Sequence, residues 1–232
     1  MLKTTSFVRF HKDGDQSELR ERWIGEHARM VLALPGVVRY VQNLSRTTDG
    51  QTPPFDGYWA LWWSDRSSYV QALQSPLWRR VQEDAAELVD TEWMERMSAE
   101  IDERVMRVGL GAPADGVSTP PPTTTKAVGV LRYLPTLRRD EANEYWVRTH
   151  GELALAIPEI GHYVHNHAAR PLRGRAAPPG FDGYSEAWFT DDATHAQALA
   201  TDGWKALAAD GPNLFERSAT IGAVVVEHVQ RG

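Results

Sequence analysis

Residues 23–44 read WIGEHARMVLALPGVVRYVQNL, and residues 146–167 read WVRTHGELALAIPEIGHYVHNH. The two stretches carry the same chemically distinctive residues in the same order, at a constant offset of 123. The matched pairs are Trp23 with Trp146, His27 with His150, Pro35 with Pro158, Tyr40 with Tyr163, and Asn43 with Asn166. Rare residues that recur in unbroken order indicate an internal repeat.

The repeat extends over most of the chain. A loop with three extra residues changes the offset to 126, and Phe-Asp-Gly-Tyr at 55–58 then overlies the same four residues at 181–184. We therefore predict an N-terminal domain at residues 1–107 and a C-terminal domain at residues 127–232, each of ordinary domain size. A proline- and glycine-rich segment, residues 108–126, has the composition of a linker between them.

The composition excludes several classes of protein. A net charge of −6 without a lysine-rich run argues against nucleic acid as a partner, because phosphates favour a clustered positive face. No apolar run approaches the roughly 20 residues of a membrane span, and the first residues do not show the basic n-region and apolar stretch expected of a signal peptide. The absence of cysteine excludes disulfides, thiol nucleophiles and thiolate metal sites. We expect a cytoplasmic protein that binds a small molecule and neither nucleic acid nor membrane.

Each copy is expected to contain a strand, a helix, two strands, a helix and a strand. Helical spacing of apolar residues predicts the first helix, with Ser17 and Asp140 as its N-caps in the two copies. The second helix is expected to break near residues 75–76 in one copy and 210–212 in the other. The predicted ranges are 6–10, 17–34, 37–44, 58–63, 65–88 and 101–108, then 127–133, 140–157, 160–167, 184–189, 191–215 and 221–229.

This order is that of the ferredoxin-like βαββαβ unit, an α+β fold. Its antiparallel sheet carries helices on one face only, so the other face needs a cover. The second copy can supply that cover. We therefore predict two ferredoxin-like βαββαβ domains that form a barrel-like pseudo-dimer within one chain. Exposed strand edges also allow a further homodimer between chains.

Histidine and tyrosine repeat together in the two copies. His27 and His150 lie within the apolar stripe of the first helix and should point at the sheet. Each is followed thirteen residues later by a strand tyrosine, Tyr40 or Tyr163. An imidazole beside a phenol suits general acid–base catalysis, and we predict these four residues as catalytic. The alternative is a core histidine satisfied by one hydrogen bond.

The second copy offers more polar groups on its strands. Tyr163, His165 and His167 alternate and share one face of their strand, and Tyr184, Glu186 and Trp188 share a face of the next. A cavity bounded by these side chains would favour the C-terminal copy as the more active one. A solvated strand face is the alternative. The remaining predicted substrate-binding residues are aromatic: Trp23, Trp146, Tyr58 and Trp62.

The same residues raise the question of a metal. His165 and His167 present two imidazoles side by side, and Glu186 could add a carboxylate. Alternating polar residues on a half-exposed strand are nevertheless common, so we predict no metal site.

The motifs resemble those of the EthD family. They are Trp-x-x-x-His on the first helix, Leu-Pro-Gly followed by Tyr-Val-Gln-Asn, and Phe-Asp-Gly-Tyr before an aromatic strand. The resemblance covers both copies and implies the dimeric α+β barrel superfamily. That superfamily includes muconolactone-type isomerases, polyketide cyclases and decarboxylases, cofactor-free oxygenases and haem-binding enzymes. In the methylmuconolactone isomerases a helix histidine and a strand tyrosine face the substrate, but the accompanying cysteine has no counterpart here.

The resemblance and the residues together favour a cofactor-independent enzyme of the lyase, decarboxylase, cyclase or isomerase type. It would act on a small aromatic or polyketide-like metabolite, with histidine moving a proton and tyrosine stabilising an oxyanion. One alternative is an oxidative enzyme of the same superfamily, either haem-dependent or a cofactor-free monooxygenase. The other is a non-catalytic protein that binds a hydrophobic metabolite.

Overall fold

A computed structural model describes residues 1–48, 50–109, 124–172 and 177–230. Most of the expected linker, residues 108–126, therefore lies outside the described residues. The strand that follows it begins at Thr125.

The first repeat contains the expected elements and one helix more. After the first strand, a continuous helical segment is divided into α1, a π-helical turn (η1) and α2. The second helix is divided into α3 and α4, and α5 was not expected from the sequence. The bounds are β1 Leu2–Val8, α1 Gln16–Arg22, η1 Trp23–His27, α2 Ala28–Leu32, β2 Val37–Arg46, β3 Gly57–Trp63, α3 Arg66–Gln74, α4 Pro76–Leu88, α5 Thr91–Arg96 and β4 Ser98–Arg107.

The second repeat follows the same order, with short 3-10 turns (η3 and η4) in place of a counterpart of α5. The bounds are β5 Thr125–Leu131, α6 Arg139–Tyr145, η2 Trp146–His150, α7 Gly151–Leu155, β6 His162–Arg170, β7 Gly183–Phe189, α8 Asp192–Ala200, α9 Asp202–Asp210, η3 Gly211–Asn213, η4 Arg217–Ala219 and β8 Ile221–Gln230.

The strand order confirms the predicted fold class. Hydrogen-bonded neighbours follow the sequence β1-β3-β2-β8-β5-β7-β6-β4, which closes as a barrel. Within the first repeat β3 pairs antiparallel with both β1 and β2, and β7 does the same with β5 and β6 in the second. Each repeat is thus a ferredoxin-like sheet, and the chain has the α+β barrel fold expected from its sequence.

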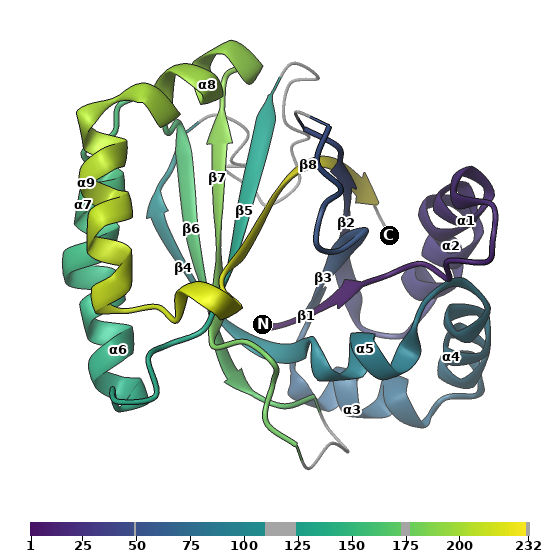
Figure 1. The fold of residues 1–232 in the computed structure, drawn as a ribbon. Helices are drawn as coiled ribbons and strands as arrows, with labels where there is room; N and C mark the ends of the chain where they lie inside the picture. The colour runs from purple at the N-terminus through teal and green to yellow at the C-terminus, as the bar shows by residue number, and fades with distance from the viewer. Residues whose placement is uncertain (49, 110–123, 173–176, 231–232) are drawn as a thin grey trace. The chain divides into compact units, whose positions relative to one another are not determined.

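Contacts along the chain define two compact units. Unit 1 comprises Met1–Ile101, Ala168–Gly180 and Val225–Gly232, and unit 2 comprises Asp102–His167 and Phe181–Val224. The final strand of each repeat therefore contributes residues to both units. In unit 2, helices α7 and α9 lie side by side along the strands, with α8 near one end of β7 (Figure 1).

Both first helices contain a π-helical turn at the same place. It runs from Trp23 to His27 in one repeat and from Trp146 to His150 in the other, so the repeated histidine closes the turn in each case. π-helical turns within α-helices are rare and are frequently found at functional sites. The sequence spacing predicted a helix here but not this local widening.

Three details of the helices differ from the sequence-based expectation. The N-cap of α1 is Asp15, whose carboxylate accepts from the amides of Ser17 and Glu18, and the N-cap of α6 is Arg138 rather than Asp140. In the first repeat the expected break is confirmed, because Ser75 caps α4. The break expected at 210–212 is also present, since α9 ends at Asp210 and the 3-10 turn η3 begins at Gly211. The second repeat has a further, unexpected break at Thr201, whose hydroxyl accepts from the amide of Trp204. A β-hydroxyl that caps a new helix explains the breaks at Ser75 and Thr201.

A tryptophan packed on a glycine joins helix to sheet in each repeat. A Cβ placed on Gly57 would lie 3.3 Å from the ring of Trp23, and one on Gly183 would lie 2.5 Å from the ring of Trp146. These glycines belong to the repeated Phe-Asp-Gly-Tyr motif. The motif aspartates are also structural, since Asp56 accepts from the amide of Phe10 at 2.9 Å. The motif therefore fixes the helix and the strand end against one another.

Among the described residues, no helix combines the length and the apolar character needed to cross a membrane.

Substitution of Gly183 tests the tryptophan–glycine contact. We expect Gly183→Ala to lower the free energy of unfolding by about 1–3 kcal/mol, because the added methyl group overpacks the site. Urea titration followed by circular dichroism measures this change. Gly211→Ala is the matched control, since no heavy atom lies within 4 Å of its added Cβ. Equal stability of the two variants would contradict this account.

Candidate functional site

His27 forms a hydrogen-bonded pair with an aspartate on the second helix of its repeat. The Nδ1 atom of His27 lies 2.8 Å from Oδ2 of Asp84 on α4. The pair is largely shielded, with side-chain exposures of 6% for His27 and 15% for Asp84. A carboxylate on Nδ1 fixes the tautomer, with the proton on Nδ1 and a lone pair on Nε2. His27 lines a cavity, so this lone pair is available to a ligand there.

Asp84 is held as a carboxylate by its surroundings. The hydrogen bond from His27, together with that from Arg22 at 2.8 Å, holds the pKa of Asp84 below its usual value despite the burial. Arg22 also pairs with Glu87 at 3.0 Å, on the exposed side of the cluster. An ionised Asp84 stabilises the imidazolium that His27 becomes when it accepts a proton.

Tyr40 lies on β2, on the face of the sheet that the helices cover. Its exposure is 1%, and its hydroxyl has no hydrogen-bond partner among the described residues. Burial raises the pKa of Tyr40 well above its ordinary value, so the phenol keeps its proton. A buried, protonated and unpaired hydroxyl is a ready hydrogen-bond donor for a ligand oxygen.

His27 and Tyr40 both line a cavity of about 270 Å³ between the sheet and helices of unit 1. Its walls are mainly apolar and aromatic, with Trp59 and Leu61 from β3 and Trp78 from α4. Polar groups lie at another part of the lining, where the hydroxyls of Ser6 and Ser98 are 2.5 Å apart. An apolar pocket with a few convergent polar groups is typical of a small-molecule site.

A segment of the second repeat completes this cavity. Leu172, which follows β6, is one of the lining residues and belongs to unit 1. The segment is anchored nearby, because Arg170 lies 3.4 Å from the buried carboxylate of Glu100 on β4. At its other end the amide of Gly180 donates to the carbonyl of Arg96 at 2.7 Å.

The second repeat contains the same histidine–aspartate pair. Nδ1 of His150 lies 2.8 Å from Oδ2 of Asp210, at the end of α9. Asp210 also accepts from the hydroxyl of Tyr145 at 2.6 Å. Burial lowers the pKa of His150 although the hydrogen bond to Asp210 opposes that effect, so the imidazole is neutral near pH 7.

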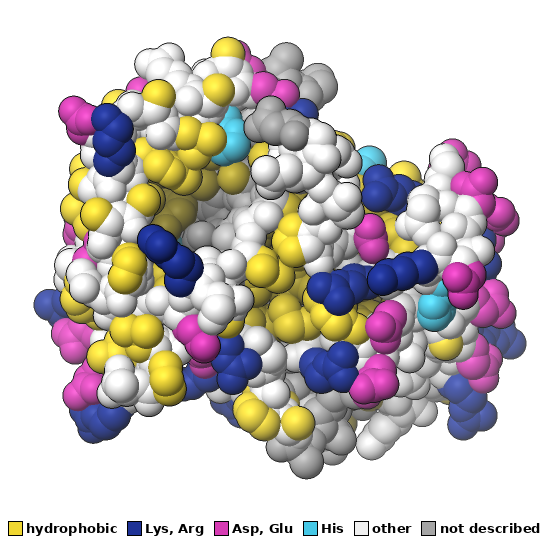
Figure 2. Space-filling model, in the orientation of Figure 1, with side chains coloured by type: hydrophobic (Ala, Val, Ile, Leu, Met, Phe, Trp, Pro, Cys, Tyr) yellow, Lys and Arg dark blue, Asp and Glu magenta, His cyan; other side chains and the backbone are white. Residues whose placement is uncertain are grey.

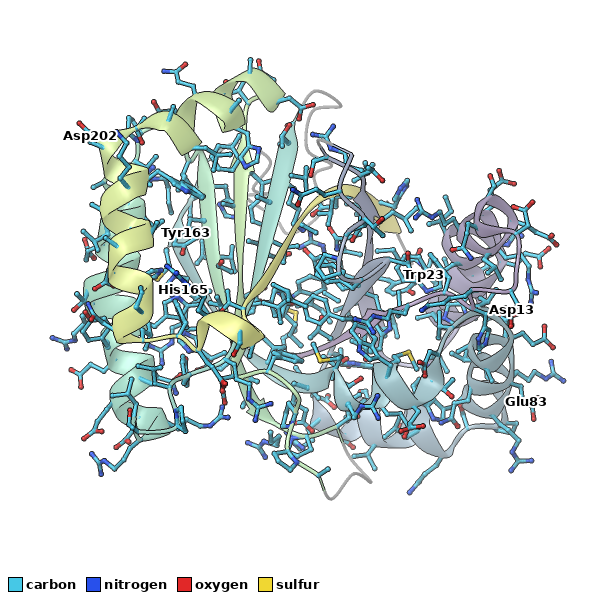
Figure 3. The ribbon with its side chains drawn as sticks, viewed as in Figure 1. Asp13, Trp23, Glu83, Tyr163, His165 and Asp202 are labelled. Atoms are coloured by element: carbon cyan, nitrogen blue, oxygen red, sulfur yellow. The ribbon has the colours of Figure 1, made fainter. Side chains whose placement is uncertain are left out.

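Tyr163, His165 and His167 share one face of β6, as predicted. Figure 3 shows Tyr163 and His165 in the space between β6 and helices α7 and α9. His165 is fully buried and stacks on Trp146 with ring centroids 4.3 Å apart, and neither ring nitrogen has a hydrogen-bond partner among the described residues. His167 differs, because its Nδ1 lies 2.8 Å from Oδ1 of Asn143.

Glu186 is not brought together with these histidines. The register pairs Glu186 with Val164, so it lies on the opposite face of the sheet from Tyr163 and His165. There it forms a buried ion pair with Lys126 at 2.7 Å. Asn166 on the same face also donates to Glu186, at 2.8 Å. Glu186, Lys126 and Asn166 therefore form a buried structural cluster within unit 2, in which the carboxylate is paired with a cation and an amide.

The predicted aromatic residues also divide between the two faces. Tyr184 and Trp188 lie with Glu186, and Tyr58 and Trp62 occupy the equivalent face in the first repeat, so none of the four joins the histidine–tyrosine constellation. Trp23 and Trp146 lie on the helix side but pack on glycine. In the first repeat the aromatic cavity lining comes instead from Trp59 and Trp78.

The sequence did not point to the two aspartates that pair with the histidines. Asp84 and Asp210 differ by 126 in number, the offset that aligns the second halves of the repeats. The alignment therefore held a signal that could have revealed them. Their contact with histidine depends on the packing of α4 and α9 against the first helices, which sequence spacing does not specify.

The cavity of the first repeat does not favour a metal or haem. Among the described residues, no group of three or more histidine, cysteine, aspartate or glutamate side chains is arranged to hold a metal ion. The cavity at His27, about 270 Å³, lies just below the roughly 300–1,000 Å³ typical of ligand pockets and is too small for a porphyrin. His165 has two unpaired nitrogens, but its ring is covered by Trp146.

A family model described as EthD domain matches residues 11–92 and again residues 134–218. No curated protein matches the sequence. Among solved structures, an anthrone oxidase-like protein aligns with a TM-score of 0.66 and 14% identity, over 99% of this chain and 92% of that chain.

Two further structures illustrate the range of similarity. A Fusobacterium nucleatum protein, provisionally named a monooxygenase, aligns with a TM-score of 0.58 and 10% identity, over 99% of this chain and 93% of its own. An EthD family protein from Bacillus halodurans is 17% identical and covers 47% of this chain and 98% of its own, with a TM-score of 0.35. At such identities the two long alignments, those to the anthrone oxidase-like and Fusobacterium proteins, support the fold and say nothing of the chemistry.

Burial of His165 predicts a pH-dependent stability. Burial lowers the pKa of His165 from 6.5 to about 2, so on acidification the unfolded chain takes up this proton first. The neutral, buried His165 therefore stabilises the folded chain fully above pH 6.5. As the pH falls from 6.5 to 5, the free energy of unfolding decreases by about 2 kcal/mol. We expect His165→Gln to flatten the pH dependence in urea titrations. The first repeat accommodates glutamine at this place, where Gln42 donates to the carbonyl of Trp23 at 2.7 Å.

His11→Gln serves as the control for this measurement, because the His11 side chain is exposed. An unchanged slope in His165→Gln would contradict the assignment of the acid sensitivity to His165.

Proposed function

The chain belongs to the EthD family, and from this premise we propose that it is an enzyme that moves a proton on a small, flat, largely apolar molecule. The observation that carries the proposal is the His27–Asp84 pair at the wall of a largely apolar cavity. The proposed reaction needs no cofactor, because a positioned base and a hydrogen-bond donor suffice for proton transfer.

His27 acts as the general base in this proposal. Its Nε2 accepts a proton from a carbon or hydroxyl group of the substrate, and Asp84 stabilises the resulting imidazolium through Nδ1. A bound substrate that fills the largely apolar cavity would displace water from His27, so the proton would remain on the imidazole until it is returned to the substrate. The donor and acceptor atoms of the substrate then decide whether the net reaction is isomerisation, elimination, decarboxylation or ring closure.

Tyr40 supplies the second part of the mechanism. Removal of a proton next to a carbonyl group places negative charge on the carbonyl oxygen. The Tyr40 hydroxyl stays protonated because burial raises its pKa, and it has no competing partner among the described residues. It can therefore donate to the enolate oxygen as the charge develops. Aromatic walls from Trp59 and Trp78 favour a flat ring in the substrate.

A second candidate reaction begins with the same step. The anthrone oxidase-like protein and the Fusobacterium protein with the monooxygenase name share this fold, which motivates an oxidative variant. A carbanion formed by His27 would react with dioxygen, and a CH₂ group plus O₂ would yield a carbonyl group plus water. Anthrone in aerated buffer, followed with an oxygen electrode, tests this. Oxygen uptake no faster than in buffer alone would exclude the oxidative reaction for this substrate.

Replacement of His27 tests the role of the base. We expect His27→Gln to reduce hydrogen–deuterium exchange at the CH₂ groups of 2-indanone by about 100-fold or more, the usual contribution of a general base. The flat bicyclic ketone is a probe, and the exchange is followed in D₂O by proton NMR. His150→Gln is the matched control, because it removes the same residue type from the same place in the other repeat.

Three outcomes separate the possible roles. Loss in His27→Gln with most of the activity retained in His150→Gln supports the proposal. Loss only in His150→Gln would move the chemistry to the second repeat and overturn the assignment to His27. Exchange at the buffer rate in all three proteins, with the probe bound, would favour a non-catalytic binding protein.

A further inference from the structure

We propose that the second repeat carries a separate, wider binding site for a planar polycyclic aromatic compound. The site lies on the helix-covered face of the unit 2 sheet. The inference extends the proposed function to a second ligand, but it concerns binding and can be tested without turnover.

The residues that fill the floor of the first cavity are replaced by small ones in the second repeat. Trp59 and Leu61 of β3 correspond, at the offset of 126, to Ser185 and Ala187 of β7. Ser6 of β1 corresponds, at the offset of 123, to Gly129 of β5. Relative to the first repeat, one surface thus loses an indole ring, an isopropyl group and a hydroxymethyl group, and gains the hydroxyl of Ser185.

The exposure of the strands reflects these replacements. In the first repeat the central-strand residues Thr4 and Ser6 are each 1% exposed. Their counterparts Ala127 and Gly129 are half-buried, and so is Ser185 beside them. Half-buried residues on central strands that helices cover indicate an opening between the two layers.

Figure 2 shows this opening as a hollow with hydrophobic side chains on its walls, over the region of unit 2 between α9 and the strands. The apolar cluster on this side of the sheet includes Ala154 and Ala187, with Trp204 and Leu207 of α9 partly buried against it. Tyr163, labelled in Figure 3, comes from β6 into the same space.

The shape of the floor selects a flat ligand. Ala127 pairs with Ala187 and Gly129 with Ser185 on adjacent strands, so three short side chains and a glycine form one continuous patch. The spacing between strands and along a strand gives this patch dimensions of about 5 by 7 Å. A fused aromatic ring system can lie face-on over such a patch, whereas Trp59 would occupy the same space in the first repeat.

Polar groups suited to a phenol or quinone oxygen accompany the patch. Ser185 offers a hydroxyl on the floor, and the Tyr163 phenol approaches from the neighbouring strand, where the register places Tyr163 opposite Ala187. His150 is held through Nδ1 by Asp210, which leaves its Nε2 as an acceptor. Few polar groups on an apolar surface orient a ligand without requiring it to be charged.

Substitutions that replace the small side chains of the floor by the larger ones of the first repeat test the inference. We expect Ser185→Trp, which introduces the residue type of Trp59, to weaken binding of 1,8-dihydroxyanthraquinone by at least tenfold, equivalent to about 1.4 kcal/mol. Equilibrium dialysis with visible absorbance measures the affinity and the stoichiometry, expected to be one per chain. The matched control is Ala85→Trp, which fills the first cavity and should leave this affinity unchanged.

Ala187→Leu, with the residue type of Leu61, provides a milder version if the tryptophan variant does not fold. Unchanged affinity in the folded variants, or loss of affinity in Ala85→Trp, would overturn the inference. His27→Gln should bind the anthraquinone normally, so failure of the proposed catalysis and failure of this second site give different results.

Discussion

The packing of a tryptophan against a glycine sets the position of the first helix on its sheet in both repeats. Trp23 meets Gly57 and Trp146 meets Gly183 so closely that no side chain could stand between them. The π-helical turn begins at each tryptophan and ends at the histidine. Because the indole is fixed, the imidazole four residues later can point only towards the sheet and the second helix. The histidine–aspartate pair, the tyrosine beside it and the apolar space in front of them all depend on this one contact.

The sequence was sufficient to predict the repeat, the order of strands and helices, and the position of histidine near tyrosine. These features follow from local periodicity and from residues that recur at fixed offsets. The sequence was not sufficient to show which faces of neighbouring strands lie on the same side of the sheet. A period of two shows that Tyr184, Glu186 and Trp188 share a face, but which face they share depends on the register. The π-helical turn and the further break at Thr201 likewise arise from local hydrogen bonding that hydrophobic spacing does not encode.

The two repeats retain the same pair of histidine and aspartate but differ in the residues around it. In the first, the side chains of Trp59 and Leu61 narrow the space and leave a cavity of about 270 Å³. In the second, the short side chains of Ser185 and Ala187 leave more space above the strands, and the buried His165 stacks on Trp146 where the first repeat has Gln42. Duplicated scaffolds can thus keep the position of a base while the surrounding surface changes, since the base is fixed by the helices and the floor belongs to the strands.

Leu172 makes the structure of the first repeat's cavity depend on the second repeat. This residue is encoded in the second repeat, in the stretch that carries the three-residue insertion, and it lines the cavity of the first. The two halves of the gene are therefore not interchangeable modules. A recombination event that replaced one half by a homologous half from another lineage would alter a pocket whose principal residues it had left untouched, and selection on that pocket would hold the halves together as a single unit of inheritance.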